Sequence, residues 1–96
     1  MLTLPIKKKW FDMIKSGEKK EEYRDIKPYY DSRFKIYSPF ESDFMYVVFR
    51  NGYRKDSPRI KCYCYISKGP GNPEWGAEPN KLYYVLKILS VEEVQE

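Results

Sequence analysis

The chain has 96 residues, a net charge of +4, ten tyrosines, two tryptophans, two cysteines and no histidine. This length predicts one domain, residues 1–96, and the mildly basic charge is compatible with an RNA or nucleotide partner without requiring one. The lack of histidine removes the commonest metal ligand, and Cys62 and Cys64 stand too close along one strand for a disulfide. We therefore expect no metal site and no cofactor. We also expect a cytoplasmic protein, because no apolar run reaches the ~18 residues of a membrane span and no signal-peptide core is evident.

The first predicted elements are a short strand over residues 2–5, which Pro5 stops, and a helix over residues 6–16. The helix is predicted by apolar residues in steps of three and four, namely Ile6, Trp10, Met13 and Ile14. Pro5 suits the first helical turn, and Gly17 suits the left-handed position that follows a helix. This helix is the main one that the sequence predicts.

Three consecutive lysines, Lys7, Lys8 and Lys9, fall in the first turn of the predicted helix. The helix dipole is already positive there, so the three cations are slightly unfavourable in isolation. One interpretation is a solvated lysine face. The other is a surface for phosphate or RNA, since the N-terminus of a helix favours anions.

A charged strand is predicted over residues 20–26, directly after the helix. Glu22 and Arg24 are two residues apart and therefore share a face, while Lys19 lies at the turn between helix and strand. Both faces of this strand carry charge, which is typical of an edge strand. A lysine beside a carboxylate can act as a base or nucleophile, and an arginine can clamp a phosphate or stabilise developing negative charge. The alternative is a solvated cluster of ion pairs with no ligand.

The middle of the chain predicts an irregular segment and a hairpin. Residues 27–40 contain two prolines and several aromatic residues, and we expect only a possible short helical turn near Asp31. Strands are expected over residues 44–50 and 59–66. Asn51 and Gly52 predict a hairpin between them, and the polar stretch that follows makes it wide or bulged. In the second strand the alternation places Ile60, Cys62, Cys64 and Ile66 toward the core.

The last part of the chain predicts a long loop over residues 67–80 and a strand over residues 82–91 that is covered on both faces. Long loops in small domains are often functional. Trp75 in this loop and Tyr29 earlier in the chain are candidates to stack on an unpaired base, although packing in an aromatic core is the simpler interpretation. Glu74 and Glu78 offer a second carboxylate or are merely solvated.

The stretch Gly17-Glu18-Lys19-Lys20-Glu21-Glu22-Tyr23-Arg24 contains the pattern Gly-x-Lys-x-x-Glu-x-Arg complete at all four positions. This is the best-known mark of the ASCH domain, a branch of the PUA-like superfamily, which the chain resembles over nearly its whole length. The residues around the motif, from Lys8 to Gly17 and from Lys27 to Tyr30, are similar to small bacterial and phage members.

The resemblance implies an α+β fold: a PUA-like β pseudobarrel of five or six strands, with one main N-terminal helix and a possible short second one. It also implies a charged cleft, built from the motif, that binds single-stranded RNA, a nucleotide or a nucleoside. Lys19, Glu22, Arg24, Tyr29 and Trp75 would contact that ligand.

Two other functions stay open. Some family members hydrolyse acylated cytidine nucleosides and some are reported ribonucleases, and in such an enzyme Lys19, Glu22 and Arg24 would be the catalytic residues. The amidohydrolase members have a threonine where this chain has Glu22, and no later strand offers their catalytic glutamate. The third hypothesis is an accessory module that binds another protein.

Overall fold

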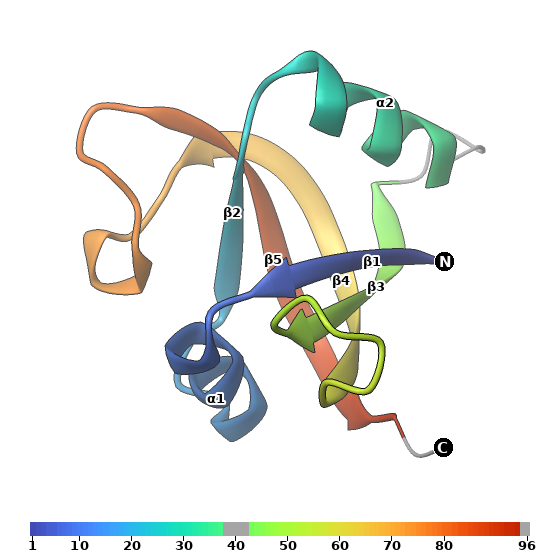
Figure 1. The fold of residues 1–96 in the computed structure, drawn as a ribbon. Coiled ribbons are helices and arrows are strands. Elements are labelled where there is room, and N and C mark those ends of the chain that lie inside the picture. The colour runs from blue at the N-terminus through green and yellow to red at the C-terminus, as the bar shows by residue number, and fades with distance from the viewer. Residues whose placement is uncertain (38–42, 95–96) are drawn as a thin grey trace.

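The computed structural model describes residues 1–37 and 43–94, which form one curled mixed sheet with two helices (Figure 1). The elements, in chain order, are β1 (Leu2–Ile6), α1 (Lys8–Ser16), β2 (Glu21–Asp25), α2 (Pro28–Tyr37), β3 (Phe44–Asn51), β4 (Arg59–Pro70), the 3-10 helix η1 (Pro73–Trp75) and β5 (Leu82–Glu93). The predicted α+β pseudobarrel of five strands with two helices is confirmed. No helix in the two described ranges is long and apolar enough to cross a membrane.

The five strands have the spatial order β1-β3-β4-β5-β2, so β1 and β2 are the two edges of the sheet. The β1–β3 pair is parallel and the other three pairs are antiparallel. The sheet curls until its two edges approach each other. Arg24 on β2 donates a hydrogen bond of 3.0 Å to the backbone carbonyl of Pro5 on β1. A polar contact thus links the two edges of the half-barrel.

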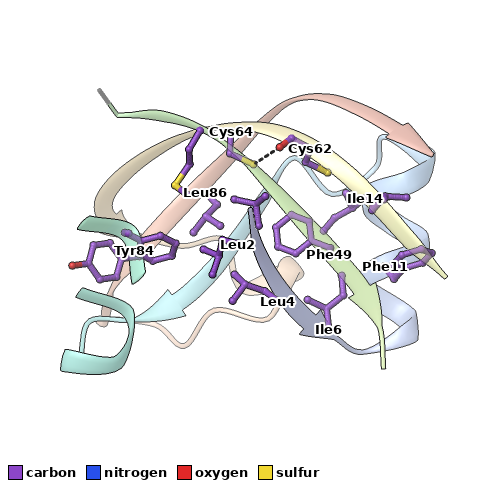
Figure 2. Close-up of a cluster of buried hydrophobic side chains, with 14 residues drawn as sticks. Leu2, Leu4, Ile6, Phe11, Ile14, Phe49, Cys62, Cys64, Tyr84 and Leu86 are labelled. Carbon is purple, nitrogen blue, oxygen red and sulfur yellow. Dashed lines mark hydrogen bonds between the residues drawn. The ribbon is translucent and has the colours of Figure 1, made fainter. Parts of the chain in front are cut away.

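The core lies on the inner face of the curled sheet (Figure 2). Alternate residues of each strand point into it, as the sequence predicted for Ile60, Cys62 and Cys64. Helix α1 adds Phe11 and Ile14 to this core, and α2 adds Phe34. Both cysteines are free and buried, and burial raises the pKa of the Cys62 thiol to about 12. The cysteines therefore contribute apolar packing and stay protonated near neutral pH.

The beginning of the chain differs from the prediction in its boundaries. Pro5 does not stop the first strand, which continues to Ile6 with Pro5 opposite Arg50. The missing N–H of a proline is tolerated because β1 is an edge strand. Helix α1 consequently begins at Lys8, so Pro5 is not in its first turn. The predicted end is confirmed, because Gly17 has φ 87° and its N–H donates to the carbonyl of Ile14.

The later part of the chain is more regular than predicted. Residues 28–37 form a full helix, α2, rather than one turn, and the rest of the predicted segment, residues 38–40, lies outside the described residues. Strand β4 continues to Pro70, which shortens the long loop to residues 71–81. The wide hairpin is confirmed, since β3 ends at Asn51 and β4 begins at Arg59. Strand β5 is covered on both faces in its first half, where Tyr84 packs in the core and Tyr83 packs in a second cluster.

Candidate functional site

The motif occupies the turn between α1 and β2. Gly17 ends the helix, and the N–H of Lys19 donates back to the carbonyl of Met13 at 2.9 Å, which fixes the turn. Strand β2 then begins at Glu21, so Glu22 and Arg24 fall on the same face of an edge strand, as predicted.

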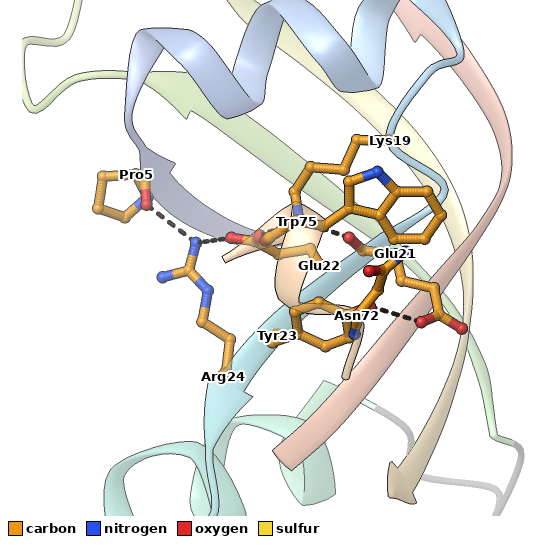
Figure 3. Close-up of polar contacts among 8 residues, drawn as sticks. All are labelled: Pro5, Lys19, Glu21, Glu22, Tyr23, Arg24, Asn72 and Trp75. Carbon is orange, nitrogen blue, oxygen red and sulfur yellow. Dashed lines mark hydrogen bonds and ion pairs between the residues drawn. The ribbon is translucent and has the colours of Figure 1, made fainter. Parts of the chain in front are cut away.

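One carboxylate joins the two cations of the motif (Figure 3). The Oε1 atom of Glu22 lies 3.2 Å from Nζ of Lys19, and its Oε2 atom accepts a hydrogen bond of 2.7 Å from Arg24. Glu22 is only 7% exposed. A carboxylate this buried requires compensating charge, and the two cations supply it. The three residues therefore converge as the sequence predicted, with a net charge of one positive.

Lys19 is sealed inside the protein, with only 1% of its surface exposed. Besides Glu22, its ammonium group donates to the backbone carbonyls of Glu21 (2.5 Å) and Trp75 (3.1 Å). It also lies over the ring of Trp10, 5.1 Å from its centroid. Burial lowers the pKa of Lys19, and the attraction of Glu22 opposes this only in part. All three N–H donors have acceptors, so this lysine joins β2 to the 71–81 loop.

Arg24 lies at the opposite end of the network. One of its terminal nitrogens contacts both Glu22 and the carbonyl of Pro5, and the other donates to the hydroxyl of Tyr30 at 3.2 Å. Burial lowers the pKa of Arg24, but the charge of Glu22 and the hydrogen bond with Tyr30 outweigh burial and leave the pKa raised. The guanidinium is a fixed, permanent cation.

An open cavity of about 340 Å³ lies beside this arginine. Its floor is formed by Glu22 and Arg24, and its walls come from the end of β1, the start of α1 and the loop after β3. The loop is held against β1 by a hydrogen bond of 3.2 Å from the N–H of Gly52 to the carbonyl of Ile6. The complete lining is Pro5, Ile6, Lys7, Lys8, Trp10, Glu22, Arg24, Asn51, Gly52 and Tyr53. This volume is at the lower end of the ~300–1,000 Å³ typical of small-molecule sites.

The lining of the cavity is cationic. Lys7, Lys8 and Arg24 supply three positive charges and Glu22 one negative charge, although Lys8 also pairs with Asp12 on the surface of α1. Lys7 is the residue before the helix, and no side chain caps the helix or places an acidic group in its first turn. The unpaired N–H groups of that turn and the helix dipole both favour an anion at this wall.

The predicted site residues are distributed unevenly around the cavity. Lys7 and Lys8 line it, whereas the ammonium of Lys9 lies over the ring of Trp10, 4.6 Å from its centroid. Tyr29 is exposed on α2 and is covered by Arg33, whose guanidinium carbon lies 3.4 Å from the ring centroid. Trp75 contributes a backbone carbonyl to Lys19. Neither Tyr29 nor Trp75 is part of the cavity lining.

The 71–81 loop packs against Lys19 and Trp10, on the side of the motif away from the cavity. A methyl group placed on Gly76 would come within 3.0 Å of the Trp10 ring, and the φ of 96° at Gly76 also favours glycine. The carboxylates of Glu74 and Glu78 are exposed and lie outside the cavity lining. The loop therefore holds Lys19 and Trp10 in place. Its length can be explained by this structural role, without a direct contact to a ligand.

Several lining residues were not predicted from the sequence. Trp10 was assigned only to the helix, Asn51 and Gly52 only to a turn, and Tyr53 was not identified as a candidate. The available signal was the hairpin itself, because a wide connection with an exposed tyrosine is longer than a tight turn needs.

A second cavity, of about 410 Å³, lies between α2, β4 and β5. Its lining includes Phe34, Tyr65 and Tyr84, with Lys68 as its basic residue. It also includes Asp43, which adjoins residues 38–42 outside the described part of the chain, so we assign no ligand to it.

Comparison with known proteins gives no further assignment: no family model, no curated protein and no solved structure matches the chain. Within residues 1–37 and 43–94, no group of three cysteine, aspartate or glutamate side chains is placed to hold a metal ion.

Proposed function

We propose that the chain binds single-stranded RNA or a nucleotide in the 340 Å³ cavity, as a member of the ASCH branch of the PUA-like superfamily. One observation carries the proposal: a single open cavity combines a buried arginine, two lysines at a helix N-terminus and two aromatic side chains. The complete motif, placed between a helix and an edge strand of a curled sheet, supports the family assignment.

Phosphate is the group that the cationic wall suits. Lys7 and Lys8 are exposed, and they lie beside a helix N-terminus that has no capping side chain. Arg24 is held in one orientation by Glu22, Tyr30 and Pro5, so its charge costs little additional ordering when a ligand binds. An anion here would offset the repulsion between the lysines and the helix dipole.

A base is the group that the remaining walls suit. Trp10 is partly buried, with the ammonium groups of Lys9 and Lys19 over its ring, and supplies an apolar wall, whereas Tyr53 is 84% exposed and offers a ring on which a base can stack. Each oxygen of Glu22 keeps a second lone pair after its contact with Lys19 or Arg24, so the carboxylate can accept from an exocyclic amino group. Asn51 adds an amide that can both donate and accept.

The test is a binding measurement with a charge-matched control. The Lys7→Gln/Lys8→Gln double variant removes two exposed cations from the cavity, and the Lys20→Gln/Lys35→Gln variant removes two exposed cations elsewhere. Affinity for a uridine dinucleotide and for nucleoside monophosphates is measured from the intrinsic fluorescence of Trp10 and Trp75 at several salt concentrations. We expect the cavity variant to lose affinity and to reduce the slope of log affinity against log salt by about 0.7 per lost phosphate contact.

Equal effects of the two double variants would show that binding follows net charge and not the cavity. An affinity that does not change with salt would remove the phosphate contacts from the proposal.

The second candidate function is that of a hydrolase, in which the same residues would have catalytic roles. The observation that favours it is a carboxylate, Glu22, at the floor of an open cavity beside a fixed cation, which suits a general base and an anion stabiliser. Lys19, sealed behind Glu22, would act only through that carboxylate. Turnover of acylated cytidine or RNA would identify an enzyme if it is retained in Lys7→Gln/Lys8→Gln and lost in Glu22→Gln under conditions where circular dichroism shows that this variant is folded. Binding without turnover would leave the binding function alone.

A further inference from the structure

The outer face of the sheet carries a row of aromatic side chains on β3 and β4, which we call the aromatic ladder. Its members are Phe44, Tyr46, Tyr63 and Tyr65. In the antiparallel register Phe44 lies opposite Tyr65 and Tyr46 lies opposite Tyr63. Residues two apart on a strand share a face, so all four rings are on the same side. The intervening residues, including Met45 and Cys64, are buried on the other side.

The four rings are in mutual contact across the two strands. Phe44 and Tyr63 are stacked, with centroids 5.8 Å apart and planes 14° apart. Tyr46 and Tyr63 are 4.8 Å apart, and Phe44 and Tyr65 are 5.1 Å apart. The ladder is therefore a continuous aromatic surface built on two paired strands of the sheet, which limits its conformational freedom.

This surface is open to solvent. Phe44 is 45% exposed and Tyr46 is 46% exposed, although both helices place their apolar residues against the opposite face of the sheet. Tyr63 and Tyr65 are half-buried by their neighbours in the ladder. Contiguous exposed aromatic surface of this kind is characteristic of a binding face.

The surroundings of the ladder carry more basic than acidic groups. The ammonium of Lys61 lies over the ring of Tyr46, 4.6 Å from its centroid, and also pairs with Glu92 at 3.6 Å. Lys87 is exposed on β5 directly opposite Tyr65, with Glu21 opposite it on β2. Arg50 occupies the same face of β3, two positions beyond Val48. Flat rings interleaved with cations are what stacking of unpaired bases and contact with their phosphates require.

We propose that the aromatic ladder is a second binding surface, on which unpaired bases of single-stranded RNA stack. A second copy of the chain is a poorer occupant. A two-fold interface brings two copies of the same patch together, and the excess of positive charge around Lys61 and Lys87 opposes this. Three of the four rings are tyrosines, whose hydroxyl groups remain hydrated when a base stacks on the ring face.

Strand β3 connects the two surfaces. The ladder begins at its first residue, Phe44, and the strand ends at Asn51 in the wall of the cavity. Asn51 lies five positions beyond Tyr46 along the strand, a span of about 17 Å at ~3.4 Å per residue. An RNA of several nucleotides can therefore contact both surfaces, whereas a dinucleotide reaches only one. Binding at the ladder does not depend on the proposed function of the cavity.

The experiment compares oligouridylates of two and about eight nucleotides, a length within the ~4–16 nucleotides that single-strand binding domains cover. Affinity is measured by fluorescence anisotropy of the labelled RNA. Phe44→Leu/Tyr46→Leu keeps apolar bulk and removes two rings, and Tyr46→Phe is the control that keeps the ring. We expect the double variant to bind the octamer at least about fivefold more weakly, with dinucleotide affinity unchanged and Tyr46→Phe equal to the parent protein.

Lys61→Gln leaves all four rings in place and guards against a folding defect in the double variant. We expect it to lower the salt dependence of octamer binding. Equal octamer affinity of Phe44→Leu/Tyr46→Leu and the parent protein would overturn the proposal. So would a dimer, detected by sedimentation, that the double variant dissociates while RNA affinity is unchanged. If instead the cavity lysine variant binds both oligomers normally and the ladder variant does not, the ladder stands and the cavity function fails.

Discussion

The two ends of the motif have opposite surroundings, although one carboxylate connects them. At one end the Lys19 ammonium is buried, and two of its partners are backbone carbonyls. At the other end Arg24 forms the floor of an open cavity and links the two edges of the sheet. Glu22 pairs with both residues: one carboxylate oxygen contacts the buried lysine, and the other contacts the arginine that lines the cavity.

This difference separates roles that the charge pattern alone cannot separate. A lysine whose donors are all satisfied by the protein stabilises the fold and positions its neighbours. An arginine that borders open space can stabilise the fold and contact a ligand as well. The motif is therefore better described as a structural lysine and a cavity-facing arginine, aligned by a shared glutamate, than as three equivalent residues.

The largest loss of stability is expected at Glu22, the residue that pairs with both cations. Glu22→Gln keeps the side-chain volume and removes the only carboxylate that the motif cations contact in the described structure, which leaves two buried positive charges together. Removing one partner of a buried ion pair costs about 3–5 kcal/mol in the free energy of unfolding. Urea denaturation measures it, and Glu18→Gln, an exposed glutamate in the same turn, should change stability by no more than about 0.5 kcal/mol. A smaller effect of Glu22→Gln than of any Lys19 variant would contradict the central place of Glu22.

A smaller loss of stability is expected at Lys19, the buried end of the motif. Lys19→Met retains most of the side-chain volume and leaves Glu22 paired with Arg24, but it removes the hydrogen bond that holds Trp75. We expect a loss of about 1.5–3 kcal/mol, typical of hydrogen bonds to a charged group. We also expect faster amide hydrogen exchange in the 71–81 loop. Lys20→Met, which changes an exposed lysine next to it, is the control and should alter neither quantity.

The pH dependence of the stability lost in Lys19→Met shows in which direction the pKa of Lys19 is shifted. Burial lowers the pKa of Lys19 in the folded protein below its ordinary value of 10.5. Between these two values the unfolded chain binds more protons, so the contribution of Lys19 to stability increases as the pH rises toward 10.5. The difference in unfolding free energy between the parent protein and Lys19→Met should therefore grow over this range. A difference that falls with pH would mean that the pKa is raised by Glu22 instead.

The sequence predicted the local part of this arrangement. Gly17 as the end of a helix, and Glu22 and Arg24 on one face of an edge strand, follow from spacing within a few residues, and the structure confirms both. Lys19 was placed with them, but its accessibility depends on the carbonyl of Trp75, 56 residues away. Side-chain spacing does not reveal such distant partners.

Tertiary pairing also explains the main errors in the fold. Residues 67–70 contain glycine and proline and were predicted as loop, yet they continue β4 because each pairs with a residue of β5. Pro5 was predicted to stop a strand, but only an interior strand excludes proline, and β1 is an edge. In both places the position of the segment in the sheet overrides its local propensity.

The smallest change in stability is expected at the open end, where Tyr53 and Trp75 distinguish two locations for the ligand. Tyr53→Ala removes a ring that is 84% exposed, so the free energy of unfolding should change by no more than about 0.5 kcal/mol. If a base stacks in the cavity, nucleotide affinity should nevertheless fall by about 1–3 kcal/mol in binding free energy. Trp75→Ala keeps the backbone carbonyl that Lys19 uses and should leave affinity nearly unchanged. Calorimetry on both variants measures the two quantities. Loss of affinity in Trp75→Ala but not in Tyr53→Ala would contradict binding in the cavity. It would indicate that the ligand binds at the 71–81 loop, near Lys19.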